Sequence, residues 1–151
     1  MAIERGRPYS AFNYLVALGT GADTSQPRAG FQEVSGLGME ITAQEYRPGN
    51  YALNSPMKVM GMHKISDVTL KRGLIAALDL WEWLDAVRTG SQDALRTVTI
   101  QLQNEERTNV VMTWVLTNAR PIKYTGPAFN GKGTDVGIEE LVLAAEDMDL
   151  E

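Results

Sequence analysis

A period of two in hydrophobicity runs through residues 96–121, RTVTIQLQNEERTNVVMTWVLTNARP, and it restricts the fold more than any other feature. Val98, Ile100 and Leu102 alternate with threonine and glutamine, so they share one face of an extended strand. After a polar turn, a second run alternates in the same way, with Val110, Met112, Trp114 and Leu116 on one face and Val111, Thr113, Val115 and Thr117 on the other. This pattern predicts a β-hairpin whose strands each have an apolar face and a more polar one.

Other segments also have the character of strands. Residues 11–18 (AFNYLVAL), 31–36 and 38–44 are short strand-like runs bounded by glycine. Residues 63–72 (HKISDVTLKR) alternate, with Ser66, Val68 and Leu70 on one face and Asp67, Thr69 and Lys71 on the other. Between them, residues 46–56 (YRPGNYALNSP) are predicted to form a long loop, and such loops in compact domains are usually functional or flexible.

The hydrophobic period changes to that of a helix in residues 77–89. It brings Leu80, Trp81, Leu84, Val87 and Arg88 to neighbouring sides of the helix. Arg88 lies in the last turn, and Gly90 is placed to act as the C-terminal cap. The sequence therefore predicts a single helix in a chain dominated by strands.

Residues 136–148 (VGIEELVLAAEDM) fit two structures equally well. As a helix, the segment places Ile138, Leu141, Val142 and Ala145 on one face, and its composition favours that reading. As a strand, it needs an irregularity near Glu139 and Glu140 to keep its apolar residues on one side. Periodicity leaves this choice open.

Composition restricts the classes of function. The 151 residues suit a single domain (1–151) with one core and include no cysteine. Disulfides, thiolate metal sites and cysteine nucleophiles are excluded, and His63 alone does not favour a zinc site. The net charge of −5 argues against nucleic-acid binding through a basic face. No apolar stretch approaches the length of a membrane helix, and the resemblance of the first residues to a signal peptide is interrupted by Glu4, Pro8 and Asn13.

Residues 126–132 (GPAFNGK) match a phosphate-binding P-loop except at its last position. The hydroxyl that should follow Lys132 and ligate Mg²⁺ is replaced by Gly133, with Thr134 one residue late. A P-loop also requires a strand before it and a helix after it, and no βαβ succession is visible. We therefore interpret the glycines and Asn130 as a loop between strands.

Other chemically capable side chains have simpler explanations. His63 has no evident relay, Glu105, Glu106 and Arg107 suit a solvated hairpin tip, and Trp81 and Trp83 suit packing of the helix on a sheet. If their segment is extended, Glu139 and Glu140 point to opposite faces and cannot act as a glycosidase pair without a bulge. The sequence predicts no catalytic, cofactor-binding or metal site, and so no enzyme. What remains unusual is a polar Thr/Gln face, which either a solvated sheet or a channel lining would show.

Several stretches together resemble the tail-tube proteins of contractile phages and, more closely, the inner-tube proteins of phage-tail-like extracellular contractile injection systems. They run in order through nearly the whole chain: PYSAFNYLVALG (8–19), FQEVSGLGMEI (31–41), EYRPGN (45–50), KVMGMHKISDVTLKRG (58–73), LWEWL (80–84) and KYTGPAFNGKGTDVGIEELVLAAEDM (123–148). Each is weak alone, and the ordered set is specific.

The resemblance implies a mainly β fold shared with the type VI secretion tube protein: a small antiparallel β-barrel or sandwich with one flanking helix. It also implies that the last segment is a strand. In this family, hexameric rings stack into a rigid tube inside a contractile sheath, with a baseplate and spike at one end and a terminator at the other. The implied localisation is the bacterial cytoplasm during assembly, and afterwards an extracellular or membrane-tethered particle or a virion tail.

Two sets of residues follow from this resemblance. If the polar faces of the strands line the channel, the lumen candidates are Asp67, Thr69, Lys71, Thr97, Thr99, Gln101, Gln103, Thr113 and Thr117. The family's long loop contacts the adjacent ring, and the matching stacking candidates are Arg47, Pro48, Gly49, Asn50, Tyr51, Ala52, Leu53 and Asn54.

The sequence leaves the cargo open. A phage tube conducts DNA, whereas the tube of an injection system carries effector proteins. A free β-barrel that binds a small ligand is a further alternative, and a nucleotide enzyme is the least favoured one.

Overall fold

The computed structural model describes residues 2–19 and 30–151, and it is mainly β. Within these residues there is one α-helix, α1 (Asp79–Arg88), and a short 3-10 helix, η2 (Gln92–Ala94). The strands are β1 (Tyr14–Ala17), β2 (Glu33–Ser35), β3 (Met39–Tyr46), β4 (Met57–Ile65), β5 (Val68–Gly73), β6 (Arg96–Gln103), β7 (Val110–Thr125), β8 (Ile138–Ala144) and β9 (Asp147–Leu150). The predicted β fold with one flanking helix is confirmed.

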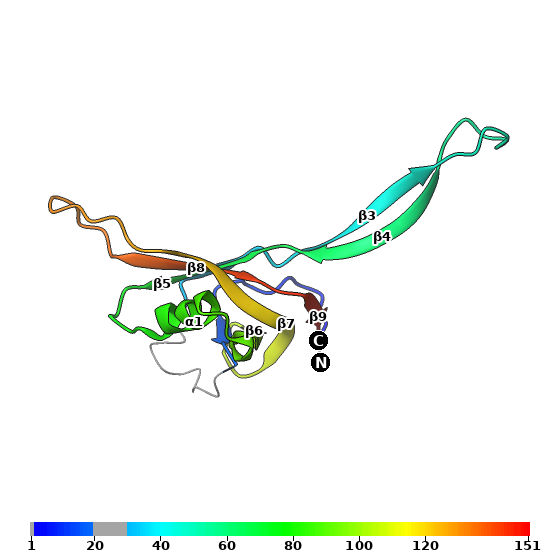
Figure 1. Cartoon of the computed structure of the whole chain (residues 1–151). Coiled ribbons are helices and arrows are strands. Elements are labelled where there is room, and N and C mark those ends of the chain that lie inside the picture. The colour runs from blue at the N-terminus through cyan, green and yellow to red at the C-terminus, as the bar shows by residue number, and fades with distance from the viewer. Residues whose placement is uncertain (1, 20–29) are drawn as a thin grey trace.

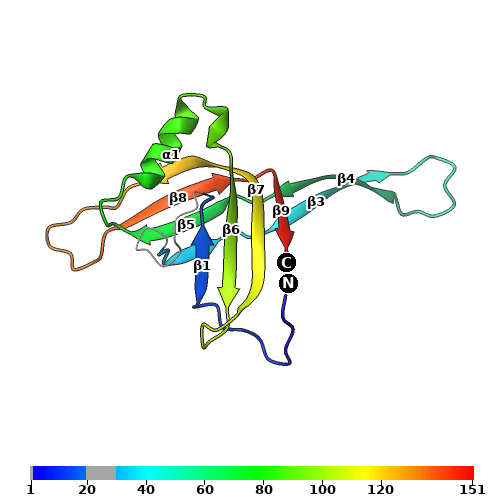
Figure 2. The ribbon, with the colours of Figure 1, turned by 90° about the horizontal axis from the view of Figure 1, so that it is seen from below.

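The long strand β7 joins the two layers of the fold. Its first half, residues 110–119, pairs with β6 and β9, whereas residues 120–125 pair with β8. The strand order is β1-β6-β7-β8-β5-β2, and every pairing is antiparallel. We call β1, β6, the first half of β7 and β9 the β6 layer, and β2, β5, β8 and the second half of β7 the β5 layer. The strands of the two layers cross (Figures 1 and 2), which is an orthogonal sandwich.

Two irregularities mark the point where β7 passes between the layers. Asn118 has a left-handed backbone with φ of 51°, a conformation that asparagine tolerates better than most residues. Pro121 is buried beside a register shift between β7 and β8, and irregular positions are where a strand accepts a residue without an N–H group. The bend therefore follows from local sequence.

The core lies between the two layers and under α1. The buried apolar side chains include Val16, Val68, Leu70, Leu80, Trp83, Val98, Ile100, Leu116, Leu141, Leu143 and Met148. The predicted alternation is confirmed on β6, where Val98 and Ile100 are buried. On β7, Val111 is buried although it was expected on the more polar face, and Val110 and Met112 are only half-buried. The backbone N–H of Ile3 donates to the carbonyl of Val111, so the N-terminal segment lies beside this part of β7.

The ambiguous last segment is a strand, β8, as the family resemblance implied. Its register with β5 is regular from Ile138 to Leu143, so the irregularity that we expected near Glu139 and Glu140 is absent. The strand instead buries Glu139 at 2% exposure on the same face as Leu141 and Leu143. Glu140 lies on the opposite, half-buried face, as predicted for an extended segment.

A buried ion-pair network compensates the charge of Glu139. Arg72, which lies directly opposite on β5, donates to Glu139 Oε1 from Nε at 2.8 Å and from Nη2 at 2.5 Å. It also donates to both carboxylate oxygens of Asp79 in the first turn of α1, at 2.9 and 3.1 Å, and the hydroxyl of Tyr124 on β7 donates to Glu139 Oε2 at 2.8 Å. Burial acts to raise the pKa of Asp79, but the hydrogen bonds and charge of Arg72 outweigh it and lower that pKa. One guanidinium thus ties β5, β8 and α1 together.

Helix α1 ends as the sequence predicts. Gly90 has φ of 83° and donates to Val87 O, while Ser91 donates to Ala86 O, which is a Schellman arrangement. The buried face differs from the expected one: Trp83, not Trp81, enters the core and donates from Nε1 to Ala94 O at 2.6 Å.

The segment predicted as one strand over residues 63–72 is two strands. β4 ends at Ile65 and β5 begins at Val68, with Ser66 and Asp67 in an exposed connection between them. The backbone of Gly36 passes so close that a Cβ atom there would lie 2.1 Å from Asp67 O. This close passage marks the point where β3 and β4 leave the body of the protein.

We predict that Glu139→Gln lowers the free energy of unfolding by about 3 kcal/mol, because the buried guanidinium of Arg72 loses one of its two carboxylate partners and keeps Asp79. Chemical denaturation measures this. The matched control is Glu140→Gln on the same strand but the opposite face, with an expected change within about 0.5 kcal/mol. Equal effects of the two substitutions would contradict the stabilising role of the pair.

Candidate assembly surfaces

Strands β3 and β4 form a two-stranded sheet that projects far from the body (Figure 1). Every residue of β3 is exposed, and in β4 only Ile65 is buried. His63 Nε2 lies 3.5 Å from Asp147 Oδ1 near the base of this hairpin. An isolated two-stranded ribbon is marginally stable in water. The hairpin therefore needs contact with another protein surface to hold a single stable conformation.

Apolar side chains lie on both faces of the β3–β4 hairpin. The register places Met39, Ile41 and Met60 on one face, at 45%, 55% and 68% exposure. Tyr46, Met57 and Val59 lie on the other face, and Met62, beside a register shift, is 88% exposed. Apolar surface of this extent on a projecting element marks an interaction site. Because one partner covers one face, the hairpin is suited to lie between two neighbours.

The tip of this hairpin is ordered by Arg47. Its Nε donates to Leu53 O at 3.0 Å and its Nη2 to Tyr51 O at 3.2 Å, while Tyr51 N donates to Pro48 O at 3.1 Å. The stacking candidates Arg47 to Asn54 thus form one shaped loop. The guanidinium of Arg47 holds this loop from within, and Leu53 is 59% exposed.

The structure separates the lumen candidates onto two faces. Thr69 and Lys71 lie on the outer face of the β5 layer, where Lys71 Nζ is 3.5 Å from Glu33 Oε2. The outer face of the β6 layer holds Thr99 and Gln101, which are half-buried. Because the core lies between the layers, these two outer faces point away from each other.

The remaining candidates lie around the β6 layer, with one exception. Thr97, Gln103 and Thr117 belong to β6 and β7, and Thr113, directly opposite Gln101, is only 9% exposed. Asp67 lies in the connection between β4 and β5. One face of one layer therefore cannot present all nine side chains.

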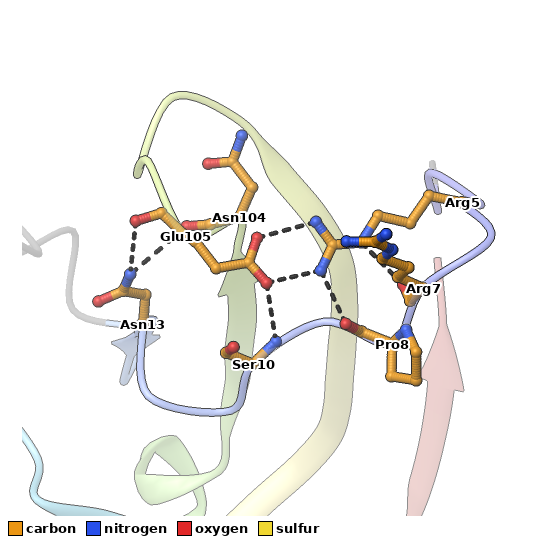
Figure 3. Close-up of polar contacts among 7 residues, drawn as sticks. All are labelled: Arg5, Arg7, Pro8, Ser10, Asn13, Asn104 and Glu105. Atoms are coloured by element: carbon orange, nitrogen blue, oxygen red, sulfur yellow. Dashed lines mark hydrogen bonds and ion pairs between the residues drawn. The ribbon is translucent and has the colours of Figure 1, made fainter.

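The N-terminal segment is fastened to the turn between β6 and β7, which the sequence did not indicate. Arg5 donates to both carboxylate oxygens of Glu105, from Nη1 at 2.8 Å and from Nη2 at 2.6 Å (Figure 3). Ser10 N donates to the same carboxylate at 3.2 Å, and Asn13 Nδ2 donates to the carbonyls of Asn104 and Glu105. The hydrogen bonds from Arg5 lower the pKa of Glu105 to about 2.

We call the contact between Arg5 and Glu105 the clasp. A cleft of about 550 Å³ lies beside it and is lined by residues 2–9, Leu102, Val111 and Met112. Across residues 2–19 and 30–151, no group of three or more His, Cys, Asp or Glu side chains is placed to hold a metal ion. In the same part of the chain, no helix has the length and apolar character needed to cross a bilayer.

The P-loop-like segment is an exposed loop between β7 and β8. Lys132 N donates to Asn130 Oδ1 at 3.0 Å, and Gly133 N donates to Asn130 O. The segment leads into strand β8 and not into a helix. It therefore lacks the helix N-terminus on which a P-loop holds phosphate.

The mainly β fold with a flanking helix and a projecting hairpin is that of phage-tail-like tube proteins. Residues 10–149 match the family model of the T4-like virus tail tube protein gp19, and the chain belongs to this family. It is a tail tube protein. Among curated protein sequences, none matches this chain.

Solved structures carry the same fold. A chain in the sheath–tube complex of PVC, an extracellular contractile injection system, is 25% identical with a TM-score of 0.83, covering 97% of this chain and 93% of its own. A chain in the tube-terminating cap of the anti-feeding prophage is 24% identical with a TM-score of 0.83, covering 100% and 95%. Hcp1 from Flavobacterium johnsoniae is 12% identical with a TM-score of 0.59, covering 91% and 93%. The family and fold expected from the sequence are confirmed.

We predict that Arg5→Gln raises the pKa of Glu105 from about 2 toward its ordinary value of 4.5. An NMR titration of the Glu105 carboxyl carbon measures it, and faster hydrogen exchange of the Ser10 amide, which donates to that carboxylate, reports release of the segment. Because the folded pKa is lowered, the clasp is held at pH values above 4.5 and is lost as the pH falls toward 2. Arg7→Gln is the matched control, and an unchanged Glu105 pKa in Arg5→Gln contradicts the assignment.

Proposed function

We propose that this chain forms hexameric rings that stack into the rigid inner tube of a contractile injection particle. The observation that carries the proposal is the β3–β4 hairpin, which is exposed along its length and apolar on both faces. Such an element is stable only against neighbouring subunits. Membership of the tail tube family supports neighbours that are further copies of the chain.

Contacts within a ring and contacts between stacked rings use different surfaces of the subunit. Exposed sheet edges invite pairing with other chains, and a closed ring removes them. A second, head-to-tail contact along the ring axis does not close, so it produces a filament. We assign the loop Arg47 to Asn54 at the hairpin tip to this second contact, since it lies farthest from the body.

The channel is lined by one of the two polar outer faces. Thr69 and Lys71 mark the face of the β5 layer, and Thr99 and Gln101 mark that of the β6 layer. A map of the assembled tube by cryo-EM distinguishes them, because only one pair then faces the axis. A channel surrounded by neither pair contradicts both assignments.

The role that we propose is mechanical. Residues 1–151 form one tube domain without chemistry of its own, and sheath contraction drives the tube through a target envelope. The proposed partners are the sheath, the baseplate and spike, a terminator and effector cargo. The sheath, the terminator and the baseplate are supported by matched structures that are described as sheath–tube, cap and baseplate assemblies. Assembly takes place in the bacterial cytoplasm before the tube becomes part of an extracellular or membrane-tethered particle.

A phage tail tube that conducts DNA is the second candidate, because the matching family model is that of a virus tail. The genes beside this one separate the two. Sheath, baseplate and spike genes without capsid genes indicate an injection system, whereas capsid genes indicate a phage.

We predict that deleting Arg47–Asn54, with a short glycine link in its place, leaves the fold and the rings intact but abolishes stacking. Circular dichroism checks the fold, and sedimentation velocity with negative-stain imaging checks assembly beside the unaltered chain. Tubes of normal length from the deletion variant would overturn the stacking role. A native chain that stays monomeric even with its baseplate partners would overturn the tube function itself.

A further inference from the structure

The connection between β5 and α1 is a loop of five consecutive apolar residues, Leu74 to Leu78 (LIAAL). Leu74, Ile75 and Leu78 are 43%, 46% and 63% exposed. An exposed run of this kind disfavours solubility unless it has a function. Ala76 within it has a left-handed backbone with φ of 57°, a conformation that costs an alanine energy and is concentrated at functional positions.

A second loop completes an apolar surface beside the first. Leu74 N donates to Gly137 O at 2.8 Å, which ties the LIAAL loop to the loop between β7 and β8. That second loop carries Phe129 and Val136, at 86% and 77% exposure. In the first turn of α1, Trp81 is 45% exposed and lies three residues after Leu78, on the same side of the helix. We call Leu74, Ile75, Leu78, Trp81, Phe129 and Val136 the end patch.

The end patch and the β3–β4 hairpin lie at opposite ends of the molecule. Both views show the loops after β5 and before β8 at one end of the β5 layer and the hairpin at the other (Figures 1 and 2). The hairpin therefore cannot reach the end patch of its own chain. Translation of a second copy along this long axis brings a hairpin toward an end patch.

The charges of the two ends are complementary. Hairpin residues 39–65 include three basic and two acidic side chains. Residues 74–82 and 126–137 together include one basic side chain, Lys132, and two acidic ones, Glu82 and Asp135, besides Asp79, whose charge is compensated by Arg72. Opposite net charge favours the encounter of the two ends and disfavours pairing of like ends.

We propose that the end patch is the docking surface for the β3–β4 hairpin of a second copy of this chain. The proposal deepens the proposed tube function and rests on it, because it names the surface that receives the hairpin. The contact is heterologous: each chain offers a hairpin at one end and an end patch at the other, so the contact repeats from copy to copy without closing on itself. Apolar faces of the hairpin are buried against apolar side chains of the end patch, which removes both from water.

Complementation between two variants tests this arrangement. Met62→Asp alters the hairpin at a position that is 88% exposed, and Leu78→Asp alters the end patch at a position that is 63% exposed, so both variants should fold. Each variant alone is expected to lose stacking in sedimentation velocity. Rings of the two variants, formed separately and then mixed in equal amounts, are expected to form pairs of stacked rings and no longer stacks, because each kind of ring keeps only one intact end. Phe12→Asp, at an exposed apolar position (67%) outside both surfaces, is the matched control and should stack normally.

Crosslinking supplies a second readout that does not depend on stable stacking. The chain contains no cysteine, so Met60→Cys and Ile75→Cys introduce unique thiols into two separate pools. A short bifunctional maleimide is expected to join the two pools when they are mixed, and not to join either pool to itself.

The outcomes separate the inference from the function on which it rests. If the native chain forms tubes, the inference is overturned by normal stacking of Leu78→Asp, by failure of the mixture to assemble, or by crosslinks within the Met60→Cys pool alone. A native chain that never forms rings or tubes overturns the proposed function first. Loss of sheath binding by Leu78→Asp with normal stacking assigns the end patch to the sheath and also overturns the inference.

Discussion

The ion pair between Arg72 and Glu139 is the constraint on which the arrangement of this protein depends. Two charges inside a core are costly to desolvate, and they are tolerated when their geometry is good and their remaining hydrogen bonds are made. Here Glu139 accepts from both Arg72 and Tyr124, and Arg72 also reaches Asp79. The pair does more than offset its own cost. A one-residue slip of β8 against β5 would turn Glu139 to the outer face and carry Glu140 inward, away from the pairing with Arg72, so the buried pair specifies the register.

That register also positions the surfaces that leave the body. β5 and β8 are extended by the hydrogen bond between Leu74 and Gly137, and the two loops that carry the end patch begin there. Asp79, held by the same guanidinium, fixes the first turn of α1 and with it Leu78 and Trp81. At the other end of β5, the close passage of Gly36 over Asp67 directs β3 and β4 out of the sandwich. The protein thus has a fully buried core and two ends, the β3–β4 hairpin and the end patch, whose apolar side chains are exposed.

Local patterns predicted those parts of the fold that local interactions determine. The alternation of β6 and the glycine cap of α1 could be read directly, because period and backbone conformation are properties of neighbouring residues. The burial of Glu139 could not be predicted, since its partner Arg72 lies 67 residues away and two adjacent glutamates in an apolar run suggest an irregularity. The same limit applies to Arg5 and Glu105, which are 100 residues apart.

The assembly surfaces were only partly visible for a related reason. Alternation shows which residues share a face of one strand, but it does not show to which layer that strand belongs, so Thr69 and Thr99 were grouped although their faces point apart. The β3–β4 hairpin is apolar on both faces and therefore lacks the one-sided pattern of an ordinary strand. A stack of subunits joined hairpin to end patch is polar: one terminus exposes hairpins and the other exposes end patches. Because these two surfaces differ in shape and in charge, a protein that completes one terminus cannot complete the other, and such a tube needs two different terminal partners.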